Sequence, residues 1–200
     1  MPILGNATTV AAKVTRAASN ALRVELTAPE GELGRAQQKG GAAVLFGFKN
    51  GGKSDYTLTS AAGEELRIAV AGTTTITTQD RPVGRIVPAN GAARFEDASG
   101  AVLAAVQPHT GFKADNAWHH RIVSPAGQEL GVLSLMRAHI GWRDIEEEAY
   151  QLLLDYNVTS LKAPSYGALL KLNAPVAPQL GDVLAGACVD FSVLPRGYIA

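Results

Sequence analysis

The sequence predicts a mainly β protein: an antiparallel β-barrel of successive hairpins around a C-terminal hydrophobic helix, plus one surface helix. Three observations predict it, namely a strand–turn–strand pattern that recurs along the chain, an apolar segment near its end, and one amphipathic stretch. The composition agrees, because 21 glycines among 200 residues supply many turns and 46% hydrophobic residues supply a core. A chain of this length suits a single domain.

The recurring pattern is an alternating apolar run, a turn that ends in glycine, and a second alternating run. Glycine adopts the positive φ that a tight turn requires, so each copy predicts a β-hairpin. The clear copies have their turns at Gly31, Gly63, Gly100 and Gly127. A degenerate fifth copy contains Gly84, and a sixth covers 160–172 around Gly167. The irregular spacing of these glycines favours a meander or barrel over a solenoid.

Two segments break the β pattern. Residues 143–155 place apolar residues on one stripe with acids opposite, which predicts an amphipathic helix on the surface. The stripe consists of Ile145, Ala149, Leu152 and Leu153. Residues 182–194 are apolar or small on almost every face, between a predicted N-cap at Asp182 and a stop at Pro195. We expect this second helix to lie inside the barrel.

The domain organisation follows from these elements. Residues 1–20 precede the first hairpin copy and are expected to form an N-terminal extension, and 21–200 form one barrel domain with 143–155 as a helical insertion. The N-terminus lacks the continuous apolar stretch of a signal peptide. The 12-residue apolar run from Val183 is too short to span a bilayer. We therefore expect no transmembrane segment and a cytoplasmic location, which includes peripheral contact with a membrane.

The charges exclude one broad class of partner. The 18 basic and 18 acidic side chains cancel, so no global field attracts the protein to nucleic acid, and any contact with an anionic bilayer must be local. Cys188 is the only cysteine, which excludes an intrachain disulfide and fits a reducing compartment. Its position in an apolar run predicts a packed thiol.

These features resemble the tubby C-terminal-like superfamily, which includes phospholipid scramblases and LURP-one-related proteins. The resemblance rests on the glycine-turn hairpins, on Gly51–Thr59 and on Leu184–Phe191, and it covers residues 20–135 and 180–195. It implies a β-barrel wound around a C-terminal hydrophobic helix. It also implies a non-enzymatic module that binds an anionic phospholipid head group or a protein partner. The chain has no acidic calcium segment beside the terminal helix and no cysteine cluster, so we do not expect scrambling activity.

Residues Gly47–Ser54 match the phosphate-loop spacing G-x-x-x-x-G-K-[ST], with Gly47, Gly52, Lys53 and Ser54 at the defining positions. A P-loop-like nucleotide-binding protein is therefore one alternative function. Such a loop requires a helix directly after it, so that the helix N-terminus faces the phosphates. The residues after Ser54 alternate like a strand instead, and no βαβ pattern surrounds the motif. We favour a glycine-rich hairpin loop.

The same region holds a modest basic patch formed by Arg35, Lys39, Lys49 and Lys53. Such a patch suits a lipid phosphate or another anion, with a solvated loop as the structural alternative. The acidic helix at 143–155 offers a different function, a scaffold that binds a protein partner. The patch and the acidic helix are the two binding surfaces that the sequence suggests.

Catalytic and metal signatures are absent from the sequence. The histidines are His109, His119, His120 and His139. Their spacing matches no zinc or iron site, and the adjacent pair would point to opposite faces of a strand. We therefore predict no metal, no cofactor and no catalytic residue. Asp190 is an acid inside the predicted buried helix, and we expect backbone amides or an arginine to satisfy it.

Overall fold

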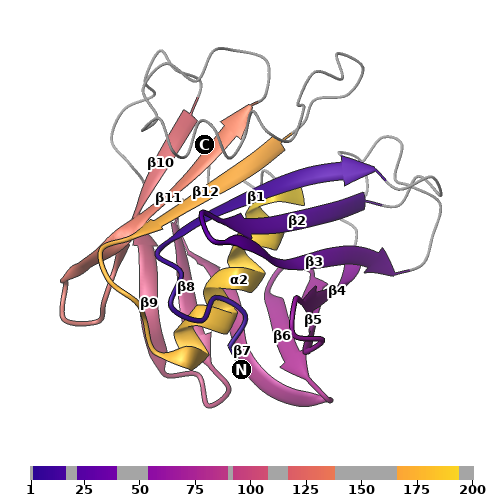
Figure 1. The fold of residues 1–200 in the computed structure, drawn as a ribbon. Helices are drawn as coiled ribbons and strands as arrows, with labels where there is room; N and C mark the ends of the chain where they lie inside the picture. The colour runs from indigo at the N-terminus through magenta and orange to yellow at the C-terminus, as the bar shows by residue number, and fades with distance from the viewer. Residues whose placement is uncertain are drawn as a thin grey trace.

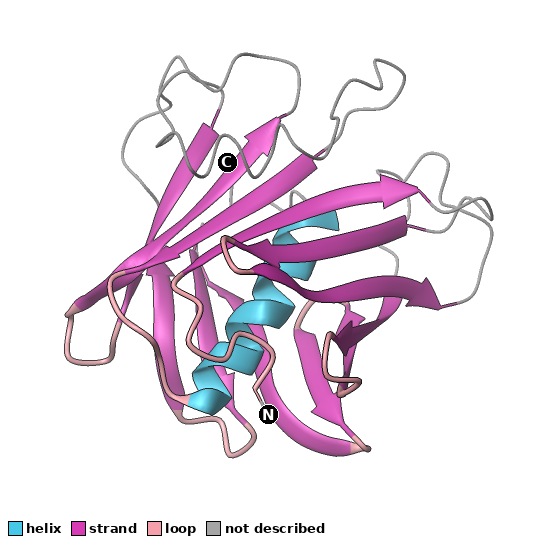
Figure 2. Ribbon diagram, in the orientation of Figure 1, coloured by secondary structure: helices cyan, strands magenta, loops and turns pink. Residues whose placement is uncertain are grey.

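The computed structural model describes residues 2–16, 22–39, 54–89, 92–107, 117–137 and 166–193. Twelve antiparallel strands form a closed barrel around one helix, α2 (Pro178–Val193), which confirms the predicted fold class (Figures 1 and 2). The predicted surface helix at 143–155 lies outside the described residues. Among the described residues, no helix is both long enough and apolar enough to cross a bilayer.

Each strand pairs with its neighbours in the chain, and the first strand pairs with the last to close the barrel. The strands are β1 (Thr9–Arg16), β2 (Leu22–Ala28), β3 (Gly31–Lys39), β4 (Ser54–Ser60), β5 (Glu65–Val70), β6 (Thr74–Thr78), β7 (Arg81–Ala89), β8 (Ala92–Asp97), β9 (Val102–Gln107), β10 (Ala117–Val123), β11 (Glu129–Arg137) and β12 (Tyr166–Leu172). Alternate residues of most strands point inward, as the alternating sequence pattern predicts.

Four of the six predicted glycine turns are confirmed. Gly31, Gly63, Gly100 and Gly127 all have positive φ and connect β2–β3, β4–β5, β8–β9 and β10–β11. Three of them share one hydrogen-bond pattern, in which the glycine N–H binds the carbonyl three residues earlier. The residue that supplies this carbonyl also accepts, through its side chain, the N–H four residues later; these residues are Ser60, Asp97 and Ser124. The recurring Ser or Asp therefore holds the turn closed.

Two predicted turns are wrong in their position. The β6–β7 turn lies at Gln79–Asp80, whose φ values of 45° and 61° suit a two-residue hairpin turn, and Gly84 is a residue of β7. Gly167 lies within β12, paired with Lys13 and Met136, and makes no turn. Glycine serves close packing at Gly84, where a Cβ would lie 2.7 Å from Val183 of α2.

The predicted N-terminal extension is wrong at its boundary, because Thr9–Arg16 forms β1 and pairs with β2 and β12. Val10, Ala11 and Ala12 are buried in succession, so this part of the strand lacks the alternation that marks the others. The residues before β1 are also part of the core: Leu4 is 2% exposed. The barrel therefore begins near the start of the described chain.

The inner helix begins earlier than predicted, at Pro178 instead of Asp182. Proline is favoured in the first helical turn, where its missing N–H costs no hydrogen bond. Asp182 is not the N-cap; its Oδ1 accepts the backbone N–H of Ile3 at 2.9 Å. The predicted burial is confirmed, since every residue from Val183 to Ser192 is buried. Figure 1 shows α2 passing through the barrel interior.

Candidate functional site

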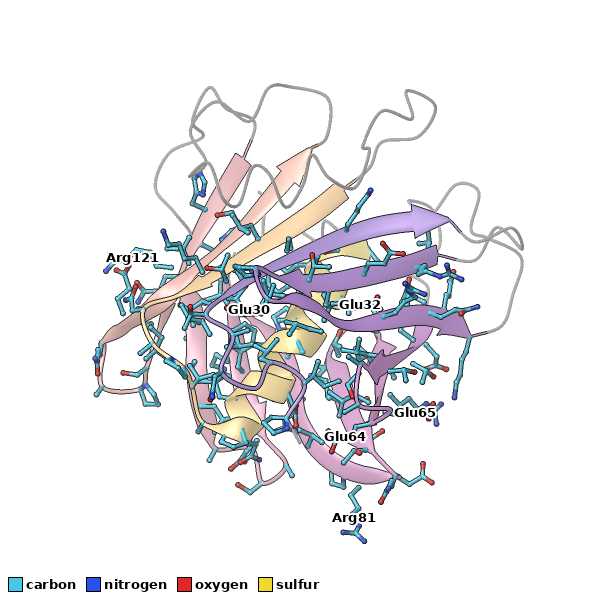
Figure 3. The ribbon with its side chains drawn as sticks, in the orientation of Figure 1. Glu30, Glu32, Glu64, Glu65, Arg81 and Arg121 are labelled. Carbon is cyan, nitrogen blue, oxygen red and sulfur yellow. The ribbon has the colours of Figure 1, made fainter. Side chains whose placement is uncertain are left out.

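The predicted basic patch is divided by the limits of the described residues. Arg35 and Lys39 lie on β3, whereas Gly47, Lys49, Gly52 and Lys53 lie outside the described residues. Arg35 and Lys39 both line a groove of about 540 Å³ on the outer face of the barrel. The other lining residues are Glu32, Gln37, Gln38, Thr57, Thr59, Ser60 and Glu65. We call this surface the β3–β4 groove, and Figure 3 labels its two carboxylates, Glu32 and Glu65.

The two described cations of the groove differ in their electrostatic surroundings. Arg35 lies 3.6 Å from Glu25, its partner across the β2–β3 hairpin, and 3.4 Å from Glu32. Two carboxylates around one guanidinium leave a local charge of −1, so Arg35 is a poor anion ligand. Lys39 is exposed and forms no ion pair with any residue that the structure describes. Lys39 is therefore the available cation of the groove.

Ser54, the last residue of the phosphate-loop motif, is the first residue of β4. A phosphate loop requires a helix at this point, so the strand argues against the nucleotide-binding interpretation. The presence of a serine at this position also has a structural explanation. Ser54 hydrogen-bonds to the side chain of Tyr56, and burial raises the pKa of Tyr56 to about 12. Tyr56 points into the core, with 1% of its surface exposed.

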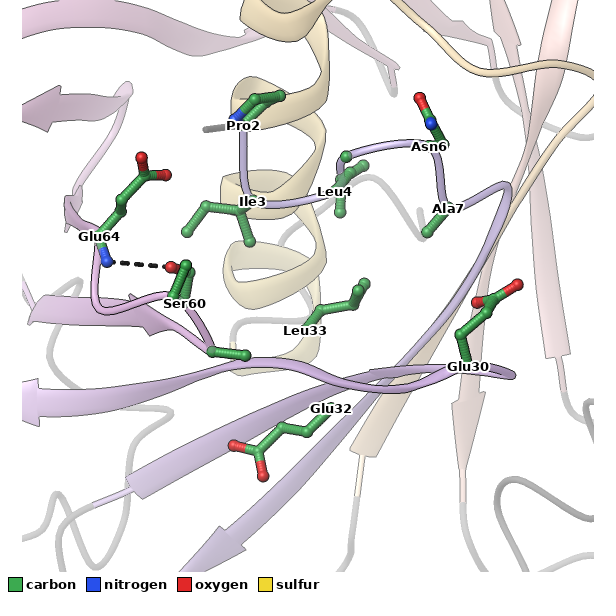
Figure 4. A pocket seen from close by; sticks show the side chains of 13 residues that line it. Pro2, Ile3, Leu4, Asn6, Ala7, Glu30, Glu32, Leu33, Ser60 and Glu64 are labelled. Carbon is green, nitrogen blue, oxygen red and sulfur yellow. Dashed lines mark hydrogen bonds between the residues drawn. The ribbon is translucent and has the colours of Figure 1, made fainter.

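A second pocket, of about 360 Å³, lies between the N-terminal segment and the turns of the β2–β3 and β4–β5 hairpins (Figure 4). Ile3, Leu4 and Leu33 form an apolar floor, and Figure 4 shows Glu30 and Glu64 on opposite sides of it. The pocket has carboxylates but no Lys or Arg among its lining residues in the described ranges. An anion would be repelled there, so this pocket does not extend the binding surface of Lys39.

The buried acid of the inner helix has a partner on β6 that the sequence did not predict. Asp190 is fully buried, and its Oδ1 accepts a hydrogen bond of 3.1 Å from the hydroxyl of Thr74 on β6. The expected bond from a backbone amide or an arginine stays a prediction. Tyr56 lies close enough for the charge of Asp190 to contribute to the raised pKa of the phenol, after burial itself. These groups form a polar contact between helix and sheet.

The histidines lie as the strand pattern predicts, where they are described. His119 faces outward, with Nδ1 2.7 Å from the Ser134 hydroxyl, and His120 is buried with its ring 6.4 Å from that of Phe191. His109 and His139 lie outside the described residues. The described part of the chain contains no group of three or more His, Cys, Asp and Glu side chains placed to hold a metal ion.

Cys188 is fully buried in α2, as predicted. Burial raises the pKa of its thiol to about 12. The nucleophilic form of cysteine is the thiolate, and this thiol is protonated at neutral pH. Cys188 is therefore a packing residue and no catalytic nucleophile.

One cluster was missed by sequence analysis. Arg85 of β7 and Arg94 of β8 both contact Glu96, a buried acid of β8. The pairing of Arg85 with Glu96 depends on the register between β7 and β8. Ending the β6–β7 turn at Gly84 hid that register, because Arg85 then begins the strand, whereas it lies in the middle of β7. The feature that could have revealed the cluster is the β7–β8 hairpin, whose pairing runs from Gly84 opposite Asp97 to Ala89 opposite Ala92.

Comparison with known proteins identifies no relative: no family model, no curated protein and no solved structure matches the chain. The resemblance to the tubby C-terminal-like superfamily therefore stays a prediction. A functional proposal for this protein therefore rests on its fold and on the geometry of the described residues.

Proposed function

We propose that the protein is a non-enzymatic module that binds the anionic head group of a phospholipid at the β3–β4 groove. The barrel supports this proposal, because α2 fills its interior with buried side chains, and the β3–β4 groove and the pocket beside the N-terminal segment both lie on the surface. A small molecule bound in a barrel needs a cavity inside it, whereas a head group on a membrane needs only an exposed surface. The surface is therefore the part of this fold that suits binding.

Lys39 is the observation that carries the proposal. It is the exposed end residue of β3 and forms no ion pair among the described residues; Asp55, which lies opposite it on β4, pairs with Arg67. An ammonium without a partner has the strongest attraction for a phosphate, which it binds as a compact point charge. The hydroxyls of Thr57 and Thr59 and the amide of Gln37 line the same groove and offer hydrogen bonds to phosphate oxygens.

The sequence adds two further cations to this proposal. Lys49 and Lys53 belong to residues 40–53, which connect β3 to β4 in the sequence. Each basic residue near an anionic membrane surface contributes about 1 kcal/mol to binding. The resemblance to the tubby C-terminal-like superfamily also favours a head group as the ligand. Binding through a few lysines would be weak and salt-sensitive.

Vesicle flotation tests this proposal. The protein is mixed with vesicles of phosphatidylcholine alone or of phosphatidylcholine with phosphatidic acid, at low and at physiological salt. We expect the protein to float with the acidic vesicles only, and K39Q to lower the bound fraction several-fold, as the loss of about 1 kcal/mol implies. The K39Q, K49Q, K53Q triple variant should abolish binding.

Lys171→Gln is the matched control, because it removes one exposed lysine from β12 and changes the net charge by the same amount. K171Q should bind as the wild type does. Equal flotation of the wild type and the triple variant would overturn the assignment of the groove. Negligible flotation of the wild type with acidic vesicles would overturn the function itself.

A further inference from the structure

We propose that Arg85 and Arg94 form a binding site for a phosphate group on the outer face of β7 and β8. This site is separate from the β3–β4 groove, because three strand spacings of about 4.8 Å each separate β4 from β7 around the barrel. It is built entirely from described residues. The β3–β4 groove has one available cation, whereas this site has two guanidinium groups on one carboxylate.

The sheet register brings the two arginines together. Arg85 lies directly opposite Glu96 in the β7–β8 pair, and Arg94 precedes Glu96 by two residues on the same strand. Residues two apart on a strand point to the same face, so Arg94 and Glu96 share the outer face. Arg85 and Arg94 are thus diagonal neighbours, a relation in which Cα atoms lie about 7–8 Å apart and long side chains can meet.

Glu96 fixes both guanidinium groups. Arg85 Nε donates to Glu96 Oε2 at 2.6 Å, and Arg94 Nε lies 3.4 Å from Glu96 Oε1. The Glu96 side chain is only 6% exposed, whereas those of Arg85 and Arg94 are 49% and 52% exposed. The carboxylate lies beneath the arginines, and their exposed ends are open to a ligand. A carboxylate that orients both cations before binding lowers the entropy cost of binding.

The charge of the cluster has the sign that an anion requires. Two guanidiniums share one carboxylate, which leaves +1, and neither arginine forms an ion pair with another acid in the part of the chain that the structure describes. Arg35 is the opposite case, since one guanidinium lies between two carboxylates and the sum is −1. Of the two arginine clusters, the one on β7 and β8 therefore attracts an anion.

The surroundings leave room for a ligand. Val102 lies opposite Glu96 on β9 and is 38% exposed, and Thr75 lies opposite Arg85 on β6 with its side chain exposed. Gly100 of the β8–β9 turn lies under the Arg85 guanidinium, where a Cβ would be 2.8 Å from its Nη2. The β8–β9 turn, the apolar side chain of Val102 and the hydroxyl of Thr75 therefore border the site. The turn also carries Asp97, whose carboxylate is occupied by the N–H groups of Ser99 and Ala101 and pairs with neither arginine.

The geometry points to phosphate as the ligand class. Guanidinium groups present planar pairs of N–H donors that match the oxygens of phosphate, and the Nε atoms are already engaged with Glu96. The terminal Nη atoms of two neighbouring arginines then face one tetrahedral anion. A free phosphate and a phosphomonoester on a lipid head group share this chemistry, so the experiment has an arm for each source.

The first arm is a phosphate titration followed by NMR of the arginine Nε–Hε resonances, with the ionic strength kept constant by chloride. We expect a saturable shift of the Arg85 and Arg94 signals in the wild type. R94Q should weaken phosphate binding about tenfold, which corresponds to about 1.4 kcal/mol, and R85Q, R94Q should abolish it. R67Q is the matched control, since Arg67 is paired one-to-one with Asp55 at 3.5 Å and should leave the affinity unchanged.

The second arm is flotation of the same variants with vesicles that contain phosphatidic acid. A lower floated fraction of R85Q, R94Q than of the wild type identifies a lipid phosphomonoester as the source, and unchanged flotation with lost phosphate binding identifies free phosphate. K39Q separates this site from the groove, because it should lower flotation without changing the phosphate titration. The absence of a saturable shift in the wild type, or equal phosphate affinity of the wild type and R85Q, R94Q, would overturn the proposal.

Discussion

The hydroxyl of Thr74 donates a hydrogen bond of 3.1 Å to Oδ1 of Asp190 in the interior of the barrel. Thr74 lies on β6, and Asp190 lies in the last turn of α2, 116 residues later in the chain. Apolar contacts alone allow a helix to rotate or shift within a core, because they are not directional. A buried directional bond between sheet and helix selects one rotation of α2.

Removal of the Thr74 hydroxyl is expected to destabilise the fold. Thr74→Val keeps the shape of the side chain but leaves a buried carboxylate oxygen without this donor, which costs about 1–3 kcal/mol. Thr74→Ser keeps the hydroxyl and should recover most of the loss. Urea denaturation followed by circular dichroism measures both. Equal stability of T74V and the wild type would show that the bond does not hold the helix.

Alkaline pH is expected to lower the free energy of unfolding through Tyr56 and Cys188. Burial raises the pKa of both groups to about 12, from ordinary values of 10.0 and 9.0. Their stabilising contribution is complete below pH 9. It is lost as pH rises toward 12, because the unfolded chain releases these protons first. Each unit of pKa difference corresponds to about 1.4 kcal/mol, so the loss amounts to several kcal/mol.

Tyr56→Phe and Cys188→Ala separate the two contributions. Y56F should remove the part of the slope between pH 10 and 12, and C188A the part that begins near pH 9. Urea midpoints measured from pH 7 to 11 provide the comparison, with the values at pH 7 correcting for lost packing. A double variant whose slope matches that of the wild type would contradict the assignment.

Substitution of Gly84 is expected to be costly, although it lies in a strand. A Cβ there would lie 2.5 Å from the backbone oxygen of Glu96 and 2.7 Å from Val183 Cγ2. The backbone cannot move aside as a side chain can, so Gly84→Ala should destabilise by about 1–3 kcal/mol. Gly72→Ala is the matched control, since a Cβ at Gly72 meets nothing within 4 Å. Thermal unfolding of the two variants gives the comparison, and equal midpoints would refute the close packing of β7 on α2.

Local turn chemistry is the part of the fold that the sequence predicts best. Gly63, Gly100 and Gly127 need only their own neighbours to form a turn, so a short pattern identifies them. The start of α2 depends on distant residues instead. Asp182 has the side chain of an N-cap, but it binds Ile3, which is 179 positions away. A local pattern cannot show such a contact, and the helix therefore begins one turn earlier than predicted.

The candidate sites could be predicted only in part, because charge on a barrel surface depends on the strands on either side. Arg35 and Lys39 look equivalent in the sequence. The β2–β3 register places Glu25 opposite Arg35 and neutralises it, whereas the acid opposite Lys39, Asp55 of β4, pairs with Arg67. Arg85 and Arg94 lie nine residues apart and become neighbours only when Glu96 pairs with Arg85. The sequence shows which residues are cations, but the strand register decides which of these cations can bind an anion.

The pairing of β1 with β12 determines when the protein can complete its fold during synthesis. β1 leaves the ribosome before the other eleven strands, but its second neighbour, β12, follows all of them. The helix that fills the interior follows later still. The growing sheet must therefore stay open, with its apolar face exposed, until α2 has been made and enclosed. A nascent chain of this protein thus needs protection from aggregation until translation has passed Val193.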